Sequence, residues 1–183
     1  MNHLHSLVLA ITLLVGSVSG ATAQDLQKGY DAYRAEDYKT ALQEFLPLAE
    51  QGVALAQGFL GYMYSTGQGV PQDYAKAVKW YRLAAEQGIA KAQTNLGVMY
   101  DKGQGVPQDY AEAMKWYRLA AEQGRAYAQT NLGFGYSKGE GVPQDYAIAH
   151  MWYNIGSANG HELGGTNRDN LAKKMTQADI SKA

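Results

Sequence analysis

The sequence predicts an all-α solenoid, in which short helix-turn-helix units stack on one another. Three segments of 36 residues, 53–88, 89–124 and 125–160, follow one another without a spacer, and the first two differ at only nine positions. Each segment contains two stretches with helical spacing, separated by a loop rich in glycine and proline. A unit of this size cannot bury an apolar face alone, so the repetition predicts that each unit packs on its neighbours.

The middle copy shows how the two helices of a unit are expected to form. The stretches 90–101 and 110–123 each place small and apolar residues on one side and polar residues on the other. Small residues such as Gly97 are expected to let the helices approach closely. Large rings such as Tyr117 are expected to fill the space between neighbouring units.

The loop between the two stretches carries the signals that end one helix and begin the next. Gly103 can close the first helix in a left-handed conformation, and Pro107 prevents the helix from continuing. Asp109 can then cap the second helix by accepting a hydrogen bond from a free backbone amide. The equivalent residues Asp73 and Asp145 are expected to do the same in the other copies.

Three phrases in these copies carry a family resemblance. They are Ala-Gln-x-x-Leu-Gly-x-x-Tyr, Gly-x-Gly-Val-Pro-Gln-Asp-Tyr and Ala-x-x-Trp-Tyr-x-x-Ala-Ala-x-x-Gly. Residues 53–160 thereby resemble the Sel1-like repeat, a relative of the tetratricopeptide repeat. The resemblance implies a right-handed superhelix of helix pairs. It also implies a scaffold or adaptor that binds proteins or peptides, and not an enzyme.

The segments on either side of the repeats are expected to cap the solenoid. Residues 24–52 lack the Gly-x-Gly-Val-Pro loop but keep the frame of a second helix, so they resemble a plain tetratricopeptide-type unit. Residues 161–183 are expected to form a C-terminal capping region, with a short helix after Thr166 or Asn167 that buries Leu171 and Met175.

The composition and the N-terminus indicate an exported protein. Sixteen basic and seventeen acidic residues give a formal charge of -1, which does not favour nucleic acid as a partner. Residues 7–15 form an apolar run followed by Ala21-Thr22-Ala23, so residues 1–23 are predicted to be a signal peptide cleaved after Ala23. The run is too short to span a membrane. We expect a periplasmic or secreted protein that, without cysteine, has no disulfides.

No catalytic, cofactor-binding or metal-binding residue can be assigned. The Gly-x-Gly pairs lack the strand and the Lys-Ser/Thr of phosphate-binding loops, so they are interpreted as turns. After signal removal only His150 and His161 remain, without metal-ligand spacing, and His150 is expected to be a hydrogen-bonded core residue. No serine lies in a Gly-x-Ser-x-Gly elbow. We therefore predict that the protein is not an enzyme and needs no cofactor or metal.

The positions that fail to repeat are the candidate binding residues, because superhelical repeats present their first helices along a concave groove. At these positions an apolar track, Tyr62, Val98 and Phe134, lies among amides, hydroxyls and charges, which suits a bound peptide. The alternative is that these residues only pack between units or are tolerated at the surface. The candidate face comprises Leu55, Phe59, Tyr62, Lys91, Thr94, Asn95, Val98, Asp101, Lys102, Tyr127, Thr130, Asn131, Phe134 and Lys138.

A second surface is indicated on the last copy, where Ile148 and Met151 take the positions of the charged residues Glu112 and Lys115 of the middle copy. Ile148, Met151 and Ile155 are expected either to be covered by residues 161–183 or to mediate self-association or partner binding.

The first functional hypothesis is an exported, non-enzymatic scaffold that binds a protein or peptide through the groove. A second hypothesis is a protein that binds β-lactams or peptidoglycan fragments, or a weak β-lactamase-like enzyme, as the resemblance to cysteine-rich exported relatives implies. The absence of cysteine distances this chain from them. A third is a secreted binder of host proteins, which the resemblance also implies.

Overall fold

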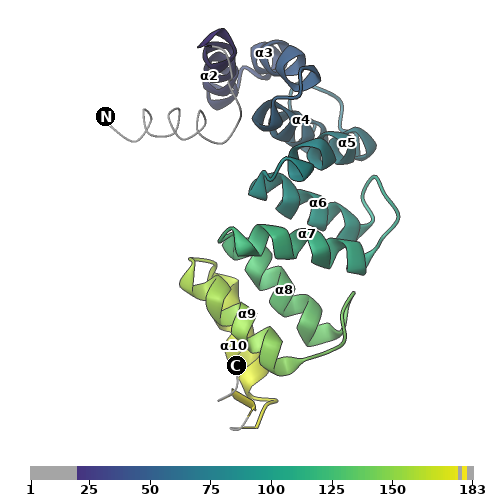
Figure 1. Ribbon diagram of the computed structural model, residues 1–183, viewed down its shortest axis with the longest axis vertical. Coiled ribbons are helices and arrows are strands. Elements are labelled where there is room, and N and C mark those ends of the chain that lie inside the picture. Colours follow the sequence, from purple (N-terminus) through teal and green to yellow (C-terminus); the bar gives the residue numbers. More distant parts are fainter. Residues whose placement is uncertain (1–19, 177–178, 181–183) are drawn as a thin grey trace.

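The structure is a computed structural model that describes residues 20–176 and 179–180. Within these residues all regular secondary structure is helical, and consecutive helices stack side by side into a curved array with α2 at one end and α10 at the other (Figure 1). This confirms the predicted all-α solenoid. The helices are α2 Gly20–Arg34, α3 Tyr38–Glu50, α4 Ala54–Thr66, α5 Tyr74–Glu86, α6 Ala90–Lys102, α7 Tyr110–Glu122, α8 Ala126–Lys138, α9 Tyr146–Ala158 and α10 Glu162–Ala172.

The predicted signal peptide falls mostly outside the described residues. The apolar run 7–15 is not among them, and α2 begins at Gly20, so its first turn includes the predicted cleavage position after Ala23. No helix in the described part of the chain is long and apolar enough to cross a bilayer.

The loop of each repeat works as the sequence predicts. Gly103 ends α6 with φ 65°, and the side chain of Asp109 accepts a hydrogen bond of 2.9 Å from the Glu112 amide at the start of α7. Gly105 has φ 73°, and a side chain there would collide with the Tyr74 carbonyl of the preceding unit. The Gly-x-Gly pair therefore combines a left-handed backbone with close packing between units.

Within each unit a glycine of the first helix packs against a tyrosine ring of the second. Tyr117 of α7 is 3% exposed and lies directly over Gly97 of α6. The seam between units is also matched in volume. Gly135 stands where the first two copies have methionine, and the Met114 side chain of the preceding unit fills that space. Small residues thus meet large ones, as the sequence predicts, but Tyr117 meets Gly97 within its own unit, whereas the rings were expected between units.

Buried glutamines link consecutive units. Gln93 of α6 is 4% exposed, and its amide nitrogen donates a 3.1 Å hydrogen bond to the Ala85 carbonyl of the preceding unit. Its amide oxygen accepts a 2.8 Å bond from Gln123, at the end of α7. Gln57 and Gln129 make the same pair of bonds in the other two copies. These repeated residues therefore have a structural role.

The change Gln93→Met is expected to lower the free energy of unfolding by about 1–3 kcal/mol, because it removes two hydrogen bonds worth roughly 0.5–1.5 kcal/mol each. Urea unfolding followed by circular dichroism measures the change. The control is Gln43→Met on α3, where the side chain is exposed and the expected change stays within about 0.5 kcal/mol. Equal effects of the two changes would contradict a linking role for Gln93.

The N-terminal unit is joined to the first repeat by aromatic rings. Phe45 of α3 is completely buried and stacks on Phe59 of α4 with 4.6 Å between ring centroids and an interplanar angle of 5°. Tyr33 of α2 meets Phe59 and Tyr62 at centroid distances of 5.5 and 6.3 Å. Residues 24–52 therefore share a continuous core with the first repeat.

The C-terminal helix begins earlier than predicted. The expected cap at Thr166 or Asn167 is wrong, because α10 starts at Glu162 and His161 takes the extended cap conformation seen at the start of α4, α6 and α8. His161 occupies the repeat position of Val53, so α10 is the first helix of a further unit. Gly164 permits this docking, since a side chain there would lie 2.7 Å from the Ser157 backbone nitrogen.

The apolar positions of α9 are only partly covered by this helix. Leu171 is buried with Tyr153, and Met175 packs against that cluster, as expected. Ile148, Met151 and Ile155 remain half-buried outside it, so their use in self-association stays a prediction. Arg168 donates a 2.9 Å hydrogen bond to Asn154, which fixes α10 against α9.

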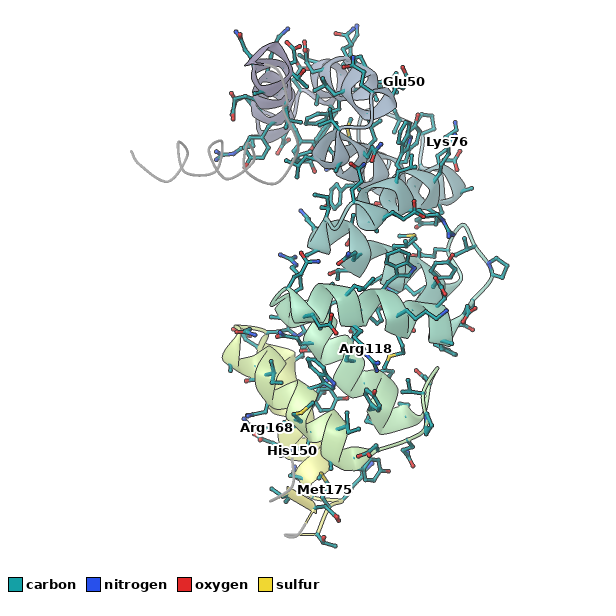
Figure 2. All side chains as sticks on the ribbon, viewed as in Figure 1. Glu50, Lys76, Arg118, His150, Arg168 and Met175 are labelled. Atoms are coloured by element: carbon teal, nitrogen blue, oxygen red, sulfur yellow. The ribbon has the colours of Figure 1, made fainter. Side chains whose placement is uncertain are left out.

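His150 differs from its expected role. It lies at the α9 end of the array with Arg168 and Met175 (Figure 2), and its Nδ1 is buried with no hydrogen-bond partner among the described residues. The prediction of a hydrogen-bonded core histidine is therefore wrong for this atom. Burial, assisted by the positive charge of Arg168, lowers the pKa of the imidazole below its ordinary value and favours the neutral ring.

Candidate binding face

The non-repeating residues of α4, α6 and α8 line several separate hollows. We call this surface the first-helix face, defined by the fourteen candidate residues of the sequence analysis. The structure brings Leu55, Phe59, Tyr62, Lys91 and Asn95 together in one hollow. Asp101, Asn131 and Phe134 line a second. Phe134 also lines a third hollow together with Lys138, between α8, α9 and α10.

The first hollow is an aromatic pocket between α2, α4, α5 and α6, with a volume of about 510 Å³ that includes space open to solvent. Three elements supply its rings: Tyr33 from the capping unit, Phe59 and Tyr62 from α4, and Tyr81 from α5. The rest of the lining is Leu55, Gly58, Ile89, Lys91, Ala92 and Asn95. A concave, mostly apolar site with a few polar groups is typical of ligand pockets in proteins.

Burial disfavours the ionised form of two of the phenols that line this pocket. It raises the pKa of Tyr33 to about 12 and that of Tyr81 to about 12. Tyr33 donates a 2.8 Å hydrogen bond to Gln68, and the Tyr81 hydroxyl lies 3.1 Å from the Ser65 hydroxyl. These hydrogen bonds hold the two rings in place. Among the residues that line the pocket, Lys91 is the one with a charged side chain.

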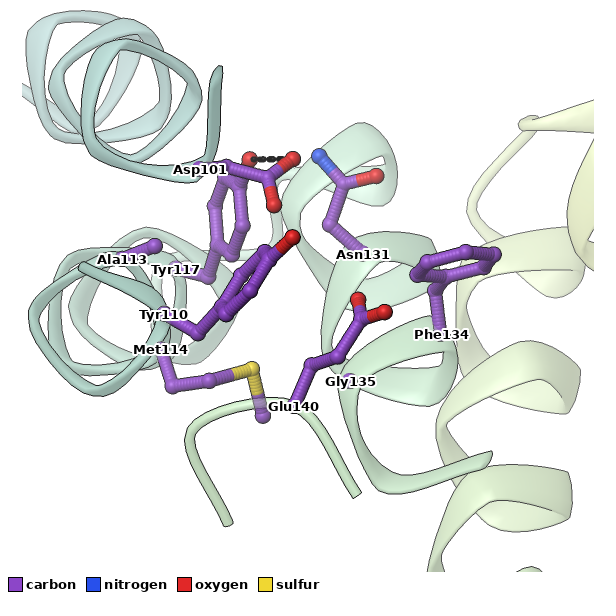
Figure 3. A pocket seen from close by; sticks show the side chains of 9 residues that line it. All are labelled: Asp101, Tyr110, Ala113, Met114, Tyr117, Asn131, Phe134, Gly135 and Glu140. Atoms are coloured by element: carbon purple, nitrogen blue, oxygen red, sulfur yellow. Dashed lines mark hydrogen bonds between the residues drawn. The ribbon is translucent and has the colours of Figure 1, made fainter. Parts of the chain in front are cut away.

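The second hollow is acidic and smaller, with a volume of about 260 Å³ (Figure 3). Asp101 accepts a 3.4 Å hydrogen bond from the Tyr117 hydroxyl, drawn as a dashed line, and Glu140 lies on the opposite side of the hollow. Burial raises the pKa of the Asp101 carboxyl above its ordinary value. Glu140 replaces the glutamine of the other two copies, so this hollow differs in charge from its equivalents.

Two of the candidate residues are inaccessible to a ligand. Thr94 and Thr130 are only 2% and 4% exposed. The Thr94 hydroxyl donates to the Ala90 carbonyl at 2.8 Å, and the Thr130 hydroxyl lies 2.9 Å from His161 Nδ1. Their predicted role as hydrogen-bonding groups for a peptide is wrong, because these hydroxyls bond within the protein.

The remaining candidates lie outside the aromatic pocket. Val98 is half-buried against the core, whereas Lys102 is exposed at the end of α6. Tyr127 is 42% exposed and meets the His161 ring edge-on at 5.3 Å, so it also packs against the start of α10. The three residues of the predicted apolar track therefore have different surroundings. Tyr62 lines the aromatic pocket, Val98 packs against the core, and the Phe134 ring is exposed.

Sequence reasoning missed Tyr33 as a wall of the aromatic pocket. Tyr33 belongs to the first helix of the capping unit, which lacks the loop of the repeats, and only the second helix of this unit was aligned with them. The signal that could have found the pocket is Gly58, a glycine at a position where the other copies have Thr94 and Thr130.

The described residues contain no group of three or more histidine, cysteine, aspartate or glutamate side chains that could hold a metal ion. Asp101 and Glu140 form at most a pair, and Asp109 is engaged as a helix cap. What the face offers chemically is apolar contact, hydrogen bonding and charge.

A stack of helix pairs in which consecutive units pack on one another defines the class of repeat solenoids. Family models of the Sel1 repeat match residues 54–89, 90–124 and 126–161, and the chain belongs to the Sel1 repeat family. The comparison with curated proteins gives no match.

The solved structures that are similar to this chain include two repeat proteins. One is a protective antigen present in uropathogenic Escherichia coli strains and displaying an SLR fold, with 44% identity and a TM-score of 0.75 over 78% of this chain and 32% of the antigen. The other is a Sel1 repeat protein from Oxalobacter formigenes, with 37% identity and a TM-score of 0.74 over 79% of this chain and 57% of that protein. The chain thus spans about a third of the first relative's length.

Proposed function

We propose that this protein is a non-enzymatic scaffold that binds a protein or peptide through its first-helix face. Membership of the Sel1 repeat family supports an interaction role. The observation that carries the proposal is the aromatic pocket, because all of its lining residues except Tyr81 and Ala92 are ones that do not repeat, whereas the repeated residues hold the fold. Aromatic side chains in a preformed pocket are the usual anchors of protein recognition.

We further propose that the scaffold works outside the cytoplasm, in the periplasm or after secretion. The apolar run 7–15 and the small residues that end at Ala23 support this location. A membrane-impermeant cross-linker applied to cells with a permeabilised outer layer reaches the protein only if it has been exported. Cross-linking with such a reagent therefore tests both whether the protein is exported and which protein it binds.

The double change Tyr62→Ala, Phe134→Ala is expected to abolish the cross-link to the native partner, because it removes one of the four rings of the pocket and the most exposed ring of the face. Phe134 is 43% exposed, so little of the fold depends on it. Mass spectrometry of the cross-linked products is the measurement, with circular dichroism as a check of folding.

The matched control is the double change Leu83→Ala, Leu119→Ala, which removes two exposed apolar side chains from the second helices α5 and α7. These residues are 36% and 44% exposed, and the control is expected to keep every cross-link. A folded Tyr62→Ala, Phe134→Ala protein that retains all partners would remove the first-helix face as the binding surface.

A further inference from the structure

We propose that the aromatic pocket receives one bulky apolar side chain from an acidic segment of the partner protein. This inference rests on the proposed function and deepens it, because it assigns the chemistry of the ligand. It follows from three features of the pocket: an unnecessary glycine in its lining, a preformed set of rings and an unpaired lysine at its edge.

Gly58 has no structural reason to be glycine. It lies inside α4, where glycine costs about 0.5–1 kcal/mol relative to alanine. A methyl group at this position would meet only the Ala84 side chain, at an ordinary distance of 3.9 Å. At the equivalent positions the same chain places Thr94 and Thr130 and buries both. The missing side chain leaves space in the pocket lining, so the glycine costs stability and keeps the pocket open.

The rings around this space are fixed before any ligand arrives. Phe59 is held by its stacking on Phe45, and Tyr33 is held by its hydrogen bond to Gln68. Tyr81 is 1% exposed and packs on Gly61. A rigid apolar cavity binds a bulky side chain without the entropy cost of ordering its own walls. The pocket is therefore suited to an aliphatic or aromatic side chain.

The charge at the edge of the pocket selects the flanking residues of the ligand. Lys91 is exposed, its ammonium lies 5.5 Å from the centre of the Tyr62 ring, and it forms no ion pair with any described carboxylate. Further along the face, Lys102 and Lys138 are likewise exposed and unpaired within the described chain. The carboxylates of Asp101 and Glu140 line the second hollow and not the aromatic pocket, and Asp101 is half-buried and bonded to Tyr117. An acidic segment is therefore complementary to the rim.

The experiment selects ligands without assuming the native partner. A phage-displayed library of random dodecapeptides is panned on the protein, and the enriched peptides are synthesised with a fluorescent label for anisotropy titration. We expect enrichment of sequences with a large apolar residue next to aspartate or glutamate. The change Gly58→Thr, which copies the other repeats, is expected to weaken binding at least tenfold while leaving the melting temperature equal or higher.

A charge exchange tests the rim independently of the cavity. Lys91→Glu is expected to weaken binding of the acidic peptide at least tenfold, and a peptide with lysine in place of its acidic residue is expected to recover binding to that variant. Lys115→Glu, at an exposed lysine of the second helix α7 that pairs with Glu112 and lies outside the pocket, is the control for the charge change and should leave the affinity unchanged.

The outcomes separate this inference from the proposed function. Peptides that bind Gly58→Thr as tightly as the wild type but fail to bind Tyr62→Ala, Phe134→Ala would overturn the pocket inference and keep the binding face. Peptides that bind all variants equally, or no enrichment at all, would overturn both. Enrichment of basic peptides would overturn the assigned charge. Self-association of the wild type that Gly58→Thr abolishes would make a second copy of this chain the occupant and overturn the acidic partner.

Discussion

Replacement of Gly97 by leucine is expected to lower the free energy of unfolding by about 3 kcal/mol, the upper part of the usual range for overpacking. A β-carbon at Gly97 would lie 2.6 Å from Tyr117 Cε1 and 3.3 Å from the Ala113 carbonyl oxygen. The ring cannot withdraw, because Tyr117 is 3% exposed and enclosed by the core of two units. The helices α6 and α7 must therefore separate. Urea unfolding monitored by circular dichroism measures the loss.

The matched changes Gly97→Ala and Gly58→Ala test whether the loss of stability at Gly97 comes from the contact with Tyr117. Both changes replace a helical glycine in the first helix of a repeat by the same residue, so both gain about 0.5–1 kcal/mol from backbone entropy. At Gly58 the methyl group fits, and a net stabilisation is expected. At Gly97 the clash with Tyr117 outweighs this gain, and a net loss is expected. Stabilisation by both changes would show that the Gly97 seam is not tightly packed.

The fold was predictable because nearly every local signal in the repeat agrees with it. Glycine, proline and aspartate at fixed offsets determine where α6 ends and α7 begins, and the structure follows them to within about one residue. The start of α10 was not predictable in the same way. This helix has Gly164, Gly165 and Arg168 at the positions where the other first helices have alanine, glutamine and leucine, so only its place after Gly160 shows that it continues the repeat.

The candidate site was predictable in its location but not in its shape. Comparing copies identified Leu55, Phe59 and Tyr62, which do line the aromatic pocket. The same comparison also selected Thr94 and Thr130, which are buried. Variation between copies shows that a position is not required by the common fold. It does not show whether the side chain faces solvent or a neighbouring unit, since both environments vary along a solenoid that ends in atypical units.

The N-terminal unit connects stability to the proposed binding function. Tyr33, one wall of the aromatic pocket, belongs to α2, and α2 is held through the ring cluster of Phe45 and Phe59. In a solenoid each unit contacts only its neighbours, so a defect at one end affects the adjacent units first. Damage to this cluster should therefore reach the pocket before it reaches the distant helices.

Phe45→Ala is accordingly expected to cost about 3–5 kcal/mol, because it empties a fully buried site and leaves Phe59 without its stacking partner. Hydrogen exchange should accelerate in α2 and α3, while α8 to α10 keep their protection. The affinity for the selected dodecapeptides should fall together with the stability of α2, because Tyr33 of α2 forms one wall of the aromatic pocket.

Phe134→Ala provides the control for this change, because it makes the same chemical replacement at a ring that is 43% exposed. Its effect on stability is expected to stay within about 0.5 kcal/mol, with no change in exchange at α2 and α3. If Phe45→Ala instead accelerates exchange equally in all helices, the array unfolds as one cooperative unit. The pocket would then owe its shape to the whole solenoid and not to the capping unit that closes it.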